Sequence, residues 1–195
     1  MKVYGSPPSP FVRKVRVVAL ELGLDLALET VATATSAELP AANPLGKIPT
    51  LIRDEGPPIF DSAVIVGYLD ALAGGGRLIP SSGEGRWRAL TLEALADGLC
   101  DAAVWRRGEM ARPAGDGHAD ALEKQARVVT RSLDALERQS GTFSGFGIGE
   151  IAAACALGYL DFRFAAEPWR PGRPGLTAWF AAVSQRPSMQ STGPG

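Results

Sequence analysis

The apolar positions of the first 24 residues follow two different spacings. The opening stretch "MKVYGS" alternates polar and apolar residues like a short strand, and Gly5, Pro7 and Pro8 end it. From Ser9 onward the apolar positions fall three or four residues apart, which is the spacing of one helix face. These positions are Phe11, Val15, Val18, Ala19 and Leu22. We therefore expect a short strand in "MKVYGS" and then a helix. Ser9 suits the N-cap of this helix and Gly23 its C-cap.

Further apolar stretches before residue 77 predict more strands and a second helix. "LALETV" (26–31) and "IPTLIRDEG" (48–56) are strand-like, and the short "PIF" (58–60) can pair with the latter. "DSAVIVGYLDALA" (61–73) predicts a helix with an acidic N-terminus. Residues 1–77 are therefore expected to form a small α/β domain in the order β-α-β, then β-β-α.

Strand patterns end after residue 77, and the remaining chain predicts helices. A stretch dense in Gly, Ser and Pro follows, so we assign residues 78–85 as a linker and 86–195 as an all-helical domain. Helical patterns cover 86–110, 118–139, 148–165 and 176–186, with a polar turn at 111–117. The helix at 148–165 is apolar nearly all round, which indicates the centre of a bundle. The final "PSMQSTGPG" is expected to be a loose tail.

Composition and charge exclude several classes of partner. The chain has 195 residues and a formal net charge of −1, so nothing favours nucleic acid or an anionic membrane as partner. No apolar run reaches the ~20 residues that span a bilayer, and a signal-peptide core is absent, so we expect a cytoplasmic protein. Cys100 and Cys155 match no metal or redox spacing and are expected to be buried free thiols. His118 is the only histidine, and we expect no metal site.

Four segments, taken in order along the chain, resemble the soluble glutathione S-transferases, most closely the serine-type members. They are "SPFVRKVRVVALELG", "NPLGKIPTL", "FDSAVIVGYLD" and "EIAAACALGYLDFR". The resemblance covers essentially the whole chain and implies a thioredoxin-like N-terminal domain, an all-helical C-terminal domain, glutathione as co-substrate and a homodimer. One motif departs from the family. Gly147 stands where the central helix usually begins with Ser or Thr, which removes the side-chain half of a capping box.

The resemblance also implies which residues bind glutathione. Pro49 would follow a cis peptide bond, and Ile48 would offer its backbone N–H and C=O to the cysteinyl part of glutathione like an added strand. Ser62 would bind the γ-glutamyl carboxylate at a helix N-terminus, Asp61 its ammonium group, and Lys47 the glycyl carboxylate. Each residue also has a plainer interpretation. Pro49 fits an ordinary turn, Asp61 and Ser62 fit a helix cap, and Lys47 fits a solvated surface.

Ser9 occupies the place of the thiol-activating residue in this family. A hydrogen bond from its hydroxyl to the glutathione thiolate would contribute about 1.5–3 kcal/mol, and the helix N-terminus would add to it. This role is compatible with an N-cap role. Family members with cysteine in this place favour thiol transfer or reductase chemistry, so Ser9 favours conjugation or glutathione-dependent addition. Ser6 is a competing hydroxyl that matches the family position less well.

Arg13, Lys14 and Arg16 follow Ser9 at a helix N-terminus, where positive charges are disfavoured. We expect most of them to face solvent or the dimer partner, and contact with the ligand or the partner chain is an alternative for Arg13.

The family places the electrophile site between the two domains. Phe11, Trp105 and Met110 are the candidates for it, with core or dimer surface as their alternative. Asp97 and Asp101 share one helix face. We expect them to be solvated or paired with a nearby arginine, in preference to contacting glutathione across a dimer.

The sequence therefore predicts a glutathione transferase that activates the thiol of glutathione for attack on small hydrophobic electrophiles. One alternative is a glutathione-binding or interaction protein that lacks useful catalysis, because a fold alone does not prove a function. Another is a glutathione-dependent peroxidase, isomerase or lyase that uses the same thiolate. No residue in the sequence decides among these activities.

Overall fold

The computed structural model describes residues 1–113, 115 and 118–194. Three short strands form one sheet near the N-terminus in the order β2-β1-β3. Strand β1 (Lys2–Gly5) pairs in parallel with β2 (Ala27–Thr30) and antiparallel with β3 (Thr50–Ile52). The strand expected at 58–60 is reduced to one bridge, in which Ile59 and Leu51 exchange two backbone hydrogen bonds. The order β-α-β and the final strand and helix are confirmed. The strand at 58–60 was wrongly predicted, and a short helix, α2 (Glu38–Ala42), lies in the stretch that was expected to be a polar loop.

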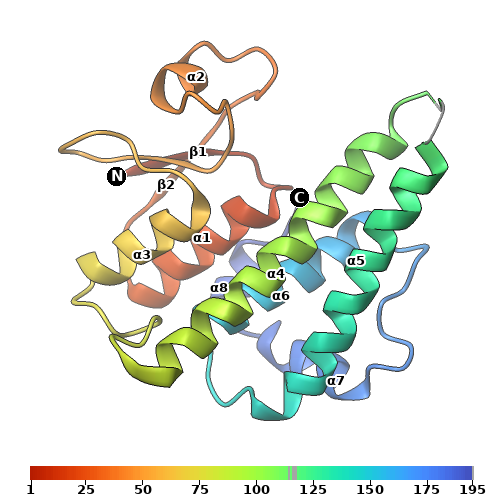
Figure 1. The fold of residues 1–195 in the computed structure, drawn as a ribbon. Helices are drawn as coiled ribbons and strands as arrows, with labels where there is room; N and C mark the ends of the chain where they lie inside the picture. Colours follow the sequence, from red (N-terminus) through yellow and green to blue (C-terminus); the bar gives the residue numbers. More distant parts are fainter. Residues whose placement is uncertain (114, 116–117, 195) are drawn as a thin grey trace.

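Helices cover both faces of this sheet, and the strand alternation decides which residues meet them (Figure 1). Val3 and Leu51 belong to the core shared with α1 (Pro10–Leu22) and α3 (Ser62–Leu72). Tyr4 and Ile52, the next residue on each strand, pack with Leu39 of α2 (Glu38–Ala42) on the other face. The two-residue period of a strand thus gives the domain its three layers.

Helix α1 has the caps that its sequence predicts. The Ser9 hydroxyl oxygen accepts a hydrogen bond from the Val12 N–H at 3.3 Å, and Pro10 occupies the first helical position. Gly23 ends the helix with φ 72°, a left-handed conformation that favours glycine. The helix start is therefore fixed in space, and Ser9 with it.

The remaining helices form an all-helical half around α6 (Ile148–Arg163), which is buried almost without interruption from Ile148 to Leu160. Figure 1 shows α4 (Gly83–Met110) and α5 (His118–Gln139) as a long antiparallel pair beside it, and α7 (Pro174–Val183) lies near η1 (Ser140–Thr142). Helix α4 begins inside the range expected as linker. Residues 114, 116 and 117 of the expected polar turn lie outside the described residues.

The segment between the two halves is tied down at both ends. The buried Asp70 carboxylate accepts hydrogen bonds from the Gly76 and Leu78 N–H groups at 2.9 and 2.8 Å. The Leu78 carbonyl accepts one from the Ile148 N–H at 3.1 Å, directly at the start of α6. A Cβ atom on Gly147 would lie 3.0 Å from that carbonyl oxygen, which is tighter than an ordinary contact. This close approach explains why glycine stands at this N-cap in place of serine or threonine.

The prediction of a loose C-terminal tail is wrong. Residues Pro187–Ser191 form α8, which packs against α1 and buries Ser188 and Met189. The carboxylate of Glu21 accepts hydrogen bonds from the Arg186 guanidinium at 2.7 and 3.0 Å and from the Ser188 hydroxyl. These contacts join residues more than 160 positions apart, so no local pattern could indicate them.

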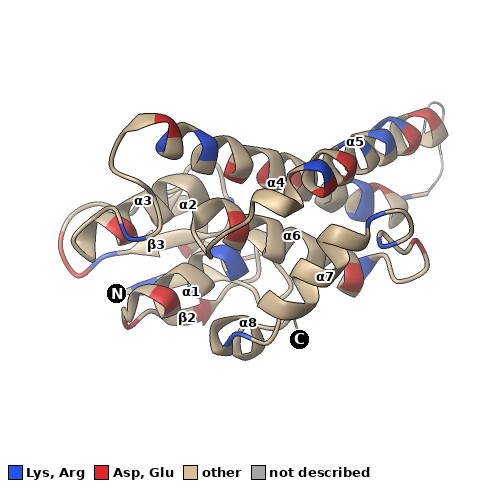
Figure 2. Ribbon diagram, turned by 90° about the horizontal axis from the view of Figure 1, so that it is seen from below, with Lys and Arg blue, Asp and Glu red and all other residues tan. Residues whose placement is uncertain are grey.

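Charged residues of both signs are interspersed along α4 and α5 (Figure 2), in keeping with the formal net charge of −1. None of the helices in the described part of the chain has the length and apolar character needed to cross a bilayer.

Candidate glutathione and electrophile site

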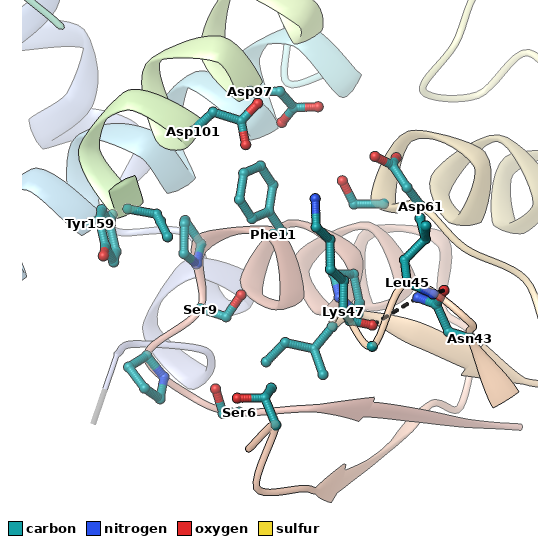
Figure 3. Close-up of a pocket in the computed structure, with 18 of the residues that line it drawn as sticks. Ser6, Ser9, Phe11, Asn43, Leu45, Lys47, Asp61, Asp97, Asp101 and Tyr159 are labelled. Atoms are coloured by element: carbon teal, nitrogen blue, oxygen red, sulfur yellow. Dashed lines mark hydrogen bonds between the residues drawn. The ribbon is translucent and has the colours of Figure 1, made fainter. Parts of the chain in front are cut away.

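A cavity of about 580 Å³ lies where the first helix, the loop before β3 and the helical half meet (Figure 3). Seven residues predicted for the site line it, although they come from separate parts of the sequence. They are Ser9, Phe11, Lys47, Ile48, Pro49, Asp61 and Ser62. Trp105 and Met110 do not line this cavity, and their side chains are exposed on α4. Phe11, Val104, Tyr159 and Arg163 also line the cavity.

Ser9 presents its hydroxyl to the cavity from the N-terminus of α1 (Figure 3). Its oxygen accepts a hydrogen bond from the Val12 N–H, but a hydroxyl group also carries one hydrogen that it can donate. The cap interaction therefore leaves the donor available for a ligand. The backbone N–H groups at the helix start add a positive partial charge near the same point.

The loop that carries Lys47, Ile48 and Pro49 is held by a buried asparagine that the sequence analysis missed. The Asn43 side-chain amide donates to the Lys47 carbonyl at 2.9 Å and to the Thr50 hydroxyl at 3.1 Å, and its oxygen accepts from the Leu45 N–H at 3.0 Å. The last contact is an Asx turn, which the letters "NPL" could have indicated. The Ile48–Pro49 peptide bond is cis, as expected.

Asp61 and Ser62 lie at the start of α3 and line the cavity from the side of the sheet domain. Asp61 is the N-cap, and its carboxylate accepts from the Ala63 N–H at 2.8 Å. Ser62 is buried, while Asp61 is exposed. The cap interpretation is therefore correct for Asp61, and it leaves the second carboxylate oxygen available to a ligand.

Two of the three cations after Ser9 are buried, which corrects the expectation that they face solvent or a dimer partner. The Lys14 ammonium donates to Glu93 at 2.9 Å and to Asp97 at 2.6 Å, and only 1% of its side chain is exposed. The Arg13 guanidinium donates to the Met189 carbonyl of α8 at 2.9 Å. Arg13 fits beside α6 because Gly158 has no side chain there. Arg16 is half-buried.

The pairing of Lys14 joins the sheet domain to α4 and changes the role expected for Asp97. Burial raises the pKa of Glu93 and of Asp97, and the Lys14 ammonium offsets part of that rise. Burial by itself lowers the pKa of Lys14, but the carboxylates of Asp97 and Glu93 outweigh it, so the net direction is upward. Asp97 is thus paired with a lysine and not with an arginine.

Asp101 lines the cavity one turn further along α4. It is exposed at the rim, and partial burial raises its pKa, while the nearby Lys47 ammonium lowers it.

Both cysteines are buried free thiols, as predicted. Burial raises the pKa of Cys155 to about 12 and that of Cys100 well above its ordinary value. Neither thiol forms a thiolate near neutral pH, so both are structural. Within the described ranges, no group of three or more His, Cys, Asp and Glu side chains is arranged to hold a metal ion.

The fold and the cavity define a class: a thioredoxin-like domain joined to a helical domain, with the site between them. Residues 8–72 match the family model described as glutathione S-transferase, N-terminal domain, and residues 119–182 match glutathione S-transferase, C-terminal domain. The chain is 36% identical to the uncharacterized GST-like protein YibF of Escherichia coli K12, over 100% of this chain and 98% of that protein. It is 31% identical to glutathione S-transferase 3 of Zea mays, over 98% and 92%. The chain belongs to the glutathione S-transferase family.

Solved structures agree with this assignment. A glutathione transferase family member from Pseudomonas fluorescens Pf-5, solved with bound glutathione, is 44% identical and superposes with a TM-score of 0.94 over 100% of this chain and 98% of that one. A glutathione S-transferase from Methylobacillus flagellatus, solved with glutathione bound, is 37% identical with a TM-score of 0.93 over 100% and 99%.

Proposed function

We propose that this protein is a glutathione transferase in which Ser9 stabilises the thiolate of glutathione. One observation carries the proposal. The Ser9 hydroxyl, with its hydrogen available, faces the same cavity as the Lys47–Pro49 loop and the start of α3. The two relatives solved with glutathione bound support glutathione as the ligand, because they are similar to this chain over its whole length.

The cavity gives each part of glutathione a matching partner. The Ser62 hydroxyl and N–H would bind the γ-glutamyl carboxylate at the N-terminus of α3, and Asp61 would bind the adjacent ammonium group. The Ile48 backbone before Pro49 would pair with the cysteinyl unit like an added strand. Lys47 would bind the glycyl carboxylate. This placement directs the sulfur toward Ser9.

The proposed mechanism requires the pKa of the glutathione thiol to be lowered modestly. A free thiol has a pKa near ~8.5, and lowering it by ~2 units requires about 2.7 kcal/mol of preferential thiolate stabilisation. A hydroxyl hydrogen bond to an anion supplies about 1.5–3 kcal/mol, and the N-terminus of α1 adds to it. The thiolate would then attack a small hydrophobic electrophile held beside Phe11. Detoxification by conjugation is the corresponding physiological role that we propose.

The Ser9→Ala variant tests the proposal. If the hydroxyl contributes about 2–3 kcal/mol, conjugation should fall by roughly 30- to 150-fold at neutral pH, with partial recovery at higher pH, because the pKa of the bound thiol rises. The ultraviolet absorbance of the bound thiolate, followed against pH, measures that pKa directly. Ser6→Ala removes the competing hydroxyl and serves as the comparison. Superimposable titrations of wild type and Ser9→Ala would remove Ser9 from the mechanism.

Two further properties belong to the same proposal. We propose a homodimer, from the family resemblance, and a cytoplasmic location, which suits two free thiols.

A peroxidase, isomerase, lyase or purely glutathione-binding role is the alternative to conjugation. Turnover with a panel of electrophiles separates conjugation from these roles. Another structure of a glutathione transferase family member from Pseudomonas fluorescens Pf-5, 44% identical to this chain, was solved with bound S-(propanoic acid)-glutathione. In this molecule the sulfur of glutathione carries a short acid. This favours a substitution or addition product in the cavity.

A further inference from the structure

The cavity has a cationic end that no part of glutathione occupies in the proposed arrangement. Tyr159 and Arg163, both on α6, line it there together with Ser9 and Phe11. In the view of Figure 3, Tyr159 lies at the opposite end of the cavity from Asp61, with Ser9 and Phe11 between them. A group attached to the sulfur of glutathione at Ser9 can therefore extend toward α6.

Arg163 has no acidic partner within the part of the chain that the structure describes. Among those residues no carboxylate lies within 4.0 Å of its guanidinium, which stacks on the Phe162 ring with 4.1 Å to the ring centroid. The other long cations near α1 are used internally: Lys14 pairs with two carboxylates, and Arg13 donates to a backbone carbonyl. Arg163 is thus a cavity-lining arginine with no carboxylate partner among the described residues. Its contact with the Tyr159 hydroxyl uses only part of its five N–H donors, which leaves others for a ligand.

The carboxylates that line the cavity come from the start of α3 and from α4, and none comes from α6. Asp61 begins α3, Asp97 is paired with Lys14, and Asp101 lies near Lys47. The charged side chains close enough to lower the pKa of Tyr159 are Arg163 and Arg107. Burial raises the pKa of Tyr159 and the two arginines lower it only in part, so the phenol keeps its proton near neutral pH and can donate a hydrogen bond. The end of the cavity at α6 is therefore suited to an anion.

We propose that Arg163 and Tyr159 form a binding subsite for a carboxylate on the electrophile, so that the preferred substrates are short haloalkanoic acids. This inference rests on the proposed function and narrows its substrate class. The glutathione thiolate attacks the carbon that bears the halogen, a carbon–sulfur bond forms, and the halide leaves with the bonding electron pair. No oxidant or reductant is needed. A planar guanidinium and one hydroxyl match a carboxylate because arginine binds it in a two-point contact.

The test compares two conjugates of the same shape. S-(2-carboxyethyl)glutathione carries the carboxylate, and S-(2-carbamoylethyl)glutathione replaces it by a neutral amide. By calorimetry we expect wild type to bind the carboxylate conjugate about 10- to 100-fold more tightly, which is the range of one or two charge-assisted hydrogen bonds. Arg163→Gln should bring this ratio close to one, mainly by weakening the binding of the carboxylate conjugate, because the neutral amide loses only an uncharged hydrogen bond. Tyr159→Phe, which keeps the buried ring, should reduce the ratio severalfold.

Arg88→Gln is the matched control, because Arg88 is exposed near the start of α4 and does not line this cavity. Turnover of 3-bromopropanoate against 3-bromopropanamide should show the same preference in kcat/KM. Equal affinity of wild type for both conjugates, or a preference that persists in Arg163→Gln, would overturn the subsite while glutathione itself still binds. Loss of all binding, including that of glutathione to wild type, would instead overturn the proposed function and the subsite with it.

Discussion

Lys14 is the residue on which the junction of the two halves depends most. Its ammonium is the only cation that contacts Glu93 and Asp97 among the described residues, and all three side chains are largely withdrawn from water. Breaking a buried ion pair by removing one partner costs about 3–5 kcal/mol, because it leaves an uncompensated buried charge. We therefore expect Lys14→Met to lower the free energy of unfolding by that amount at pH 7, as measured by urea denaturation.

The pH dependence of the stability of Lys14→Met is a second test of this ion pair. Without Lys14, the pKa values of Glu93 and Asp97 rise further above their unfolded values, because burial then acts unopposed. A group whose pKa is raised in the folded state stabilises that state when it is protonated, so the variant should regain stability as the pH falls from 7 toward 5. Replacing all three residues by Met, Gln and Asn should recover most of the loss. A deficit that does not change with pH would contradict this account.

Single residues also show where sequence reasoning stops. Ser9, Asp61 and Gly23 were predictable as caps, because a cap depends on residue type and on a few neighbouring N–H or C=O groups. Lys14 was not, because its partners lie on α4, about 80 positions away, and a lysine in a helix usually points to solvent. The Asx turn of Asn43 could have been recognised from the sequence. Its hydrogen bond to Thr50 could not, because that bond forms only when the loop is folded.

At the scale of elements, α8 supports the start of the site. It holds Arg13 through the Met189 carbonyl, and Arg13 lies one turn after Ser9 in α1. Helix α8 itself depends on Glu21, whose pKa is lowered by the hydrogen bonds from Arg186 and Ser188. A five-residue helix has almost no intrinsic stability in water, so these long-range contacts decide whether it forms. Local patterns therefore found every long helix and missed this one.

Glu21→Gln tests the attachment of α8. We expect a loss of about 1 kcal/mol in the free energy of unfolding at pH 7, a small value because Arg186 is partly exposed and solvent screens the pair. Since the pKa of Glu21 is lowered in the folded state, its contribution is present above the unfolded value of 4.5 and is lost as the pH falls through the folded one. The difference between wild type and variant should accordingly shrink below about pH 4.

Limited proteolysis gives an independent measure of the same attachment. Cleavage by thermolysin on the N-terminal side of Met189 in α8 should be faster in Glu21→Gln than in wild type, because α8 detaches more often and exposes this buried residue. Glu29→Gln is the control, since Glu29 forms an exposed ion pair with Lys2 on the sheet. Equal cleavage rates in all three proteins would show that α8 is held by its buried Met189 and not by Glu21.

At the scale of the whole molecule, the division into a sheet domain and a helical domain was predictable because the apolar period changes once along the chain. The relation between the halves was not, since it depends on Lys14 and on the Asp70 carboxylate that fixes the linker. The cavity forms between elements of both halves, so its lining residues could be predicted only through the family resemblance. Trp105 and Met110 show the limit of that approach, because helix position alone does not tell which face meets the cavity.

The proposed homodimer is the remaining prediction at this scale. Large apolar side chains are exposed on α3 and on the first turns of α4, which lie on the same side of the molecule in Figure 1. They are Val64, Leu72 and Trp87, and Trp87 is 61% exposed. A stable dimer typically buries about 1,600 Å² in total, and exposed apolar side chains of this size suit the centre of such an interface. We expect sedimentation at micromolar concentration to give twice the chain mass of 20.4 kDa.

Trp87→Lys should shift the protein toward the monomer without changing its circular dichroism, because a charge in the centre of an interface must be desolvated while the exposed side chain contributes little to the fold. Leu20→Lys is the matched control, since Leu20 is a similarly exposed apolar residue on α1, outside α3 and α4, and this variant should keep the mass of wild type. A wild-type protein that sediments as a stable 20.4 kDa monomer would rule out the dimer. A dimer that persists unchanged in Trp87→Lys would place the interface on another face.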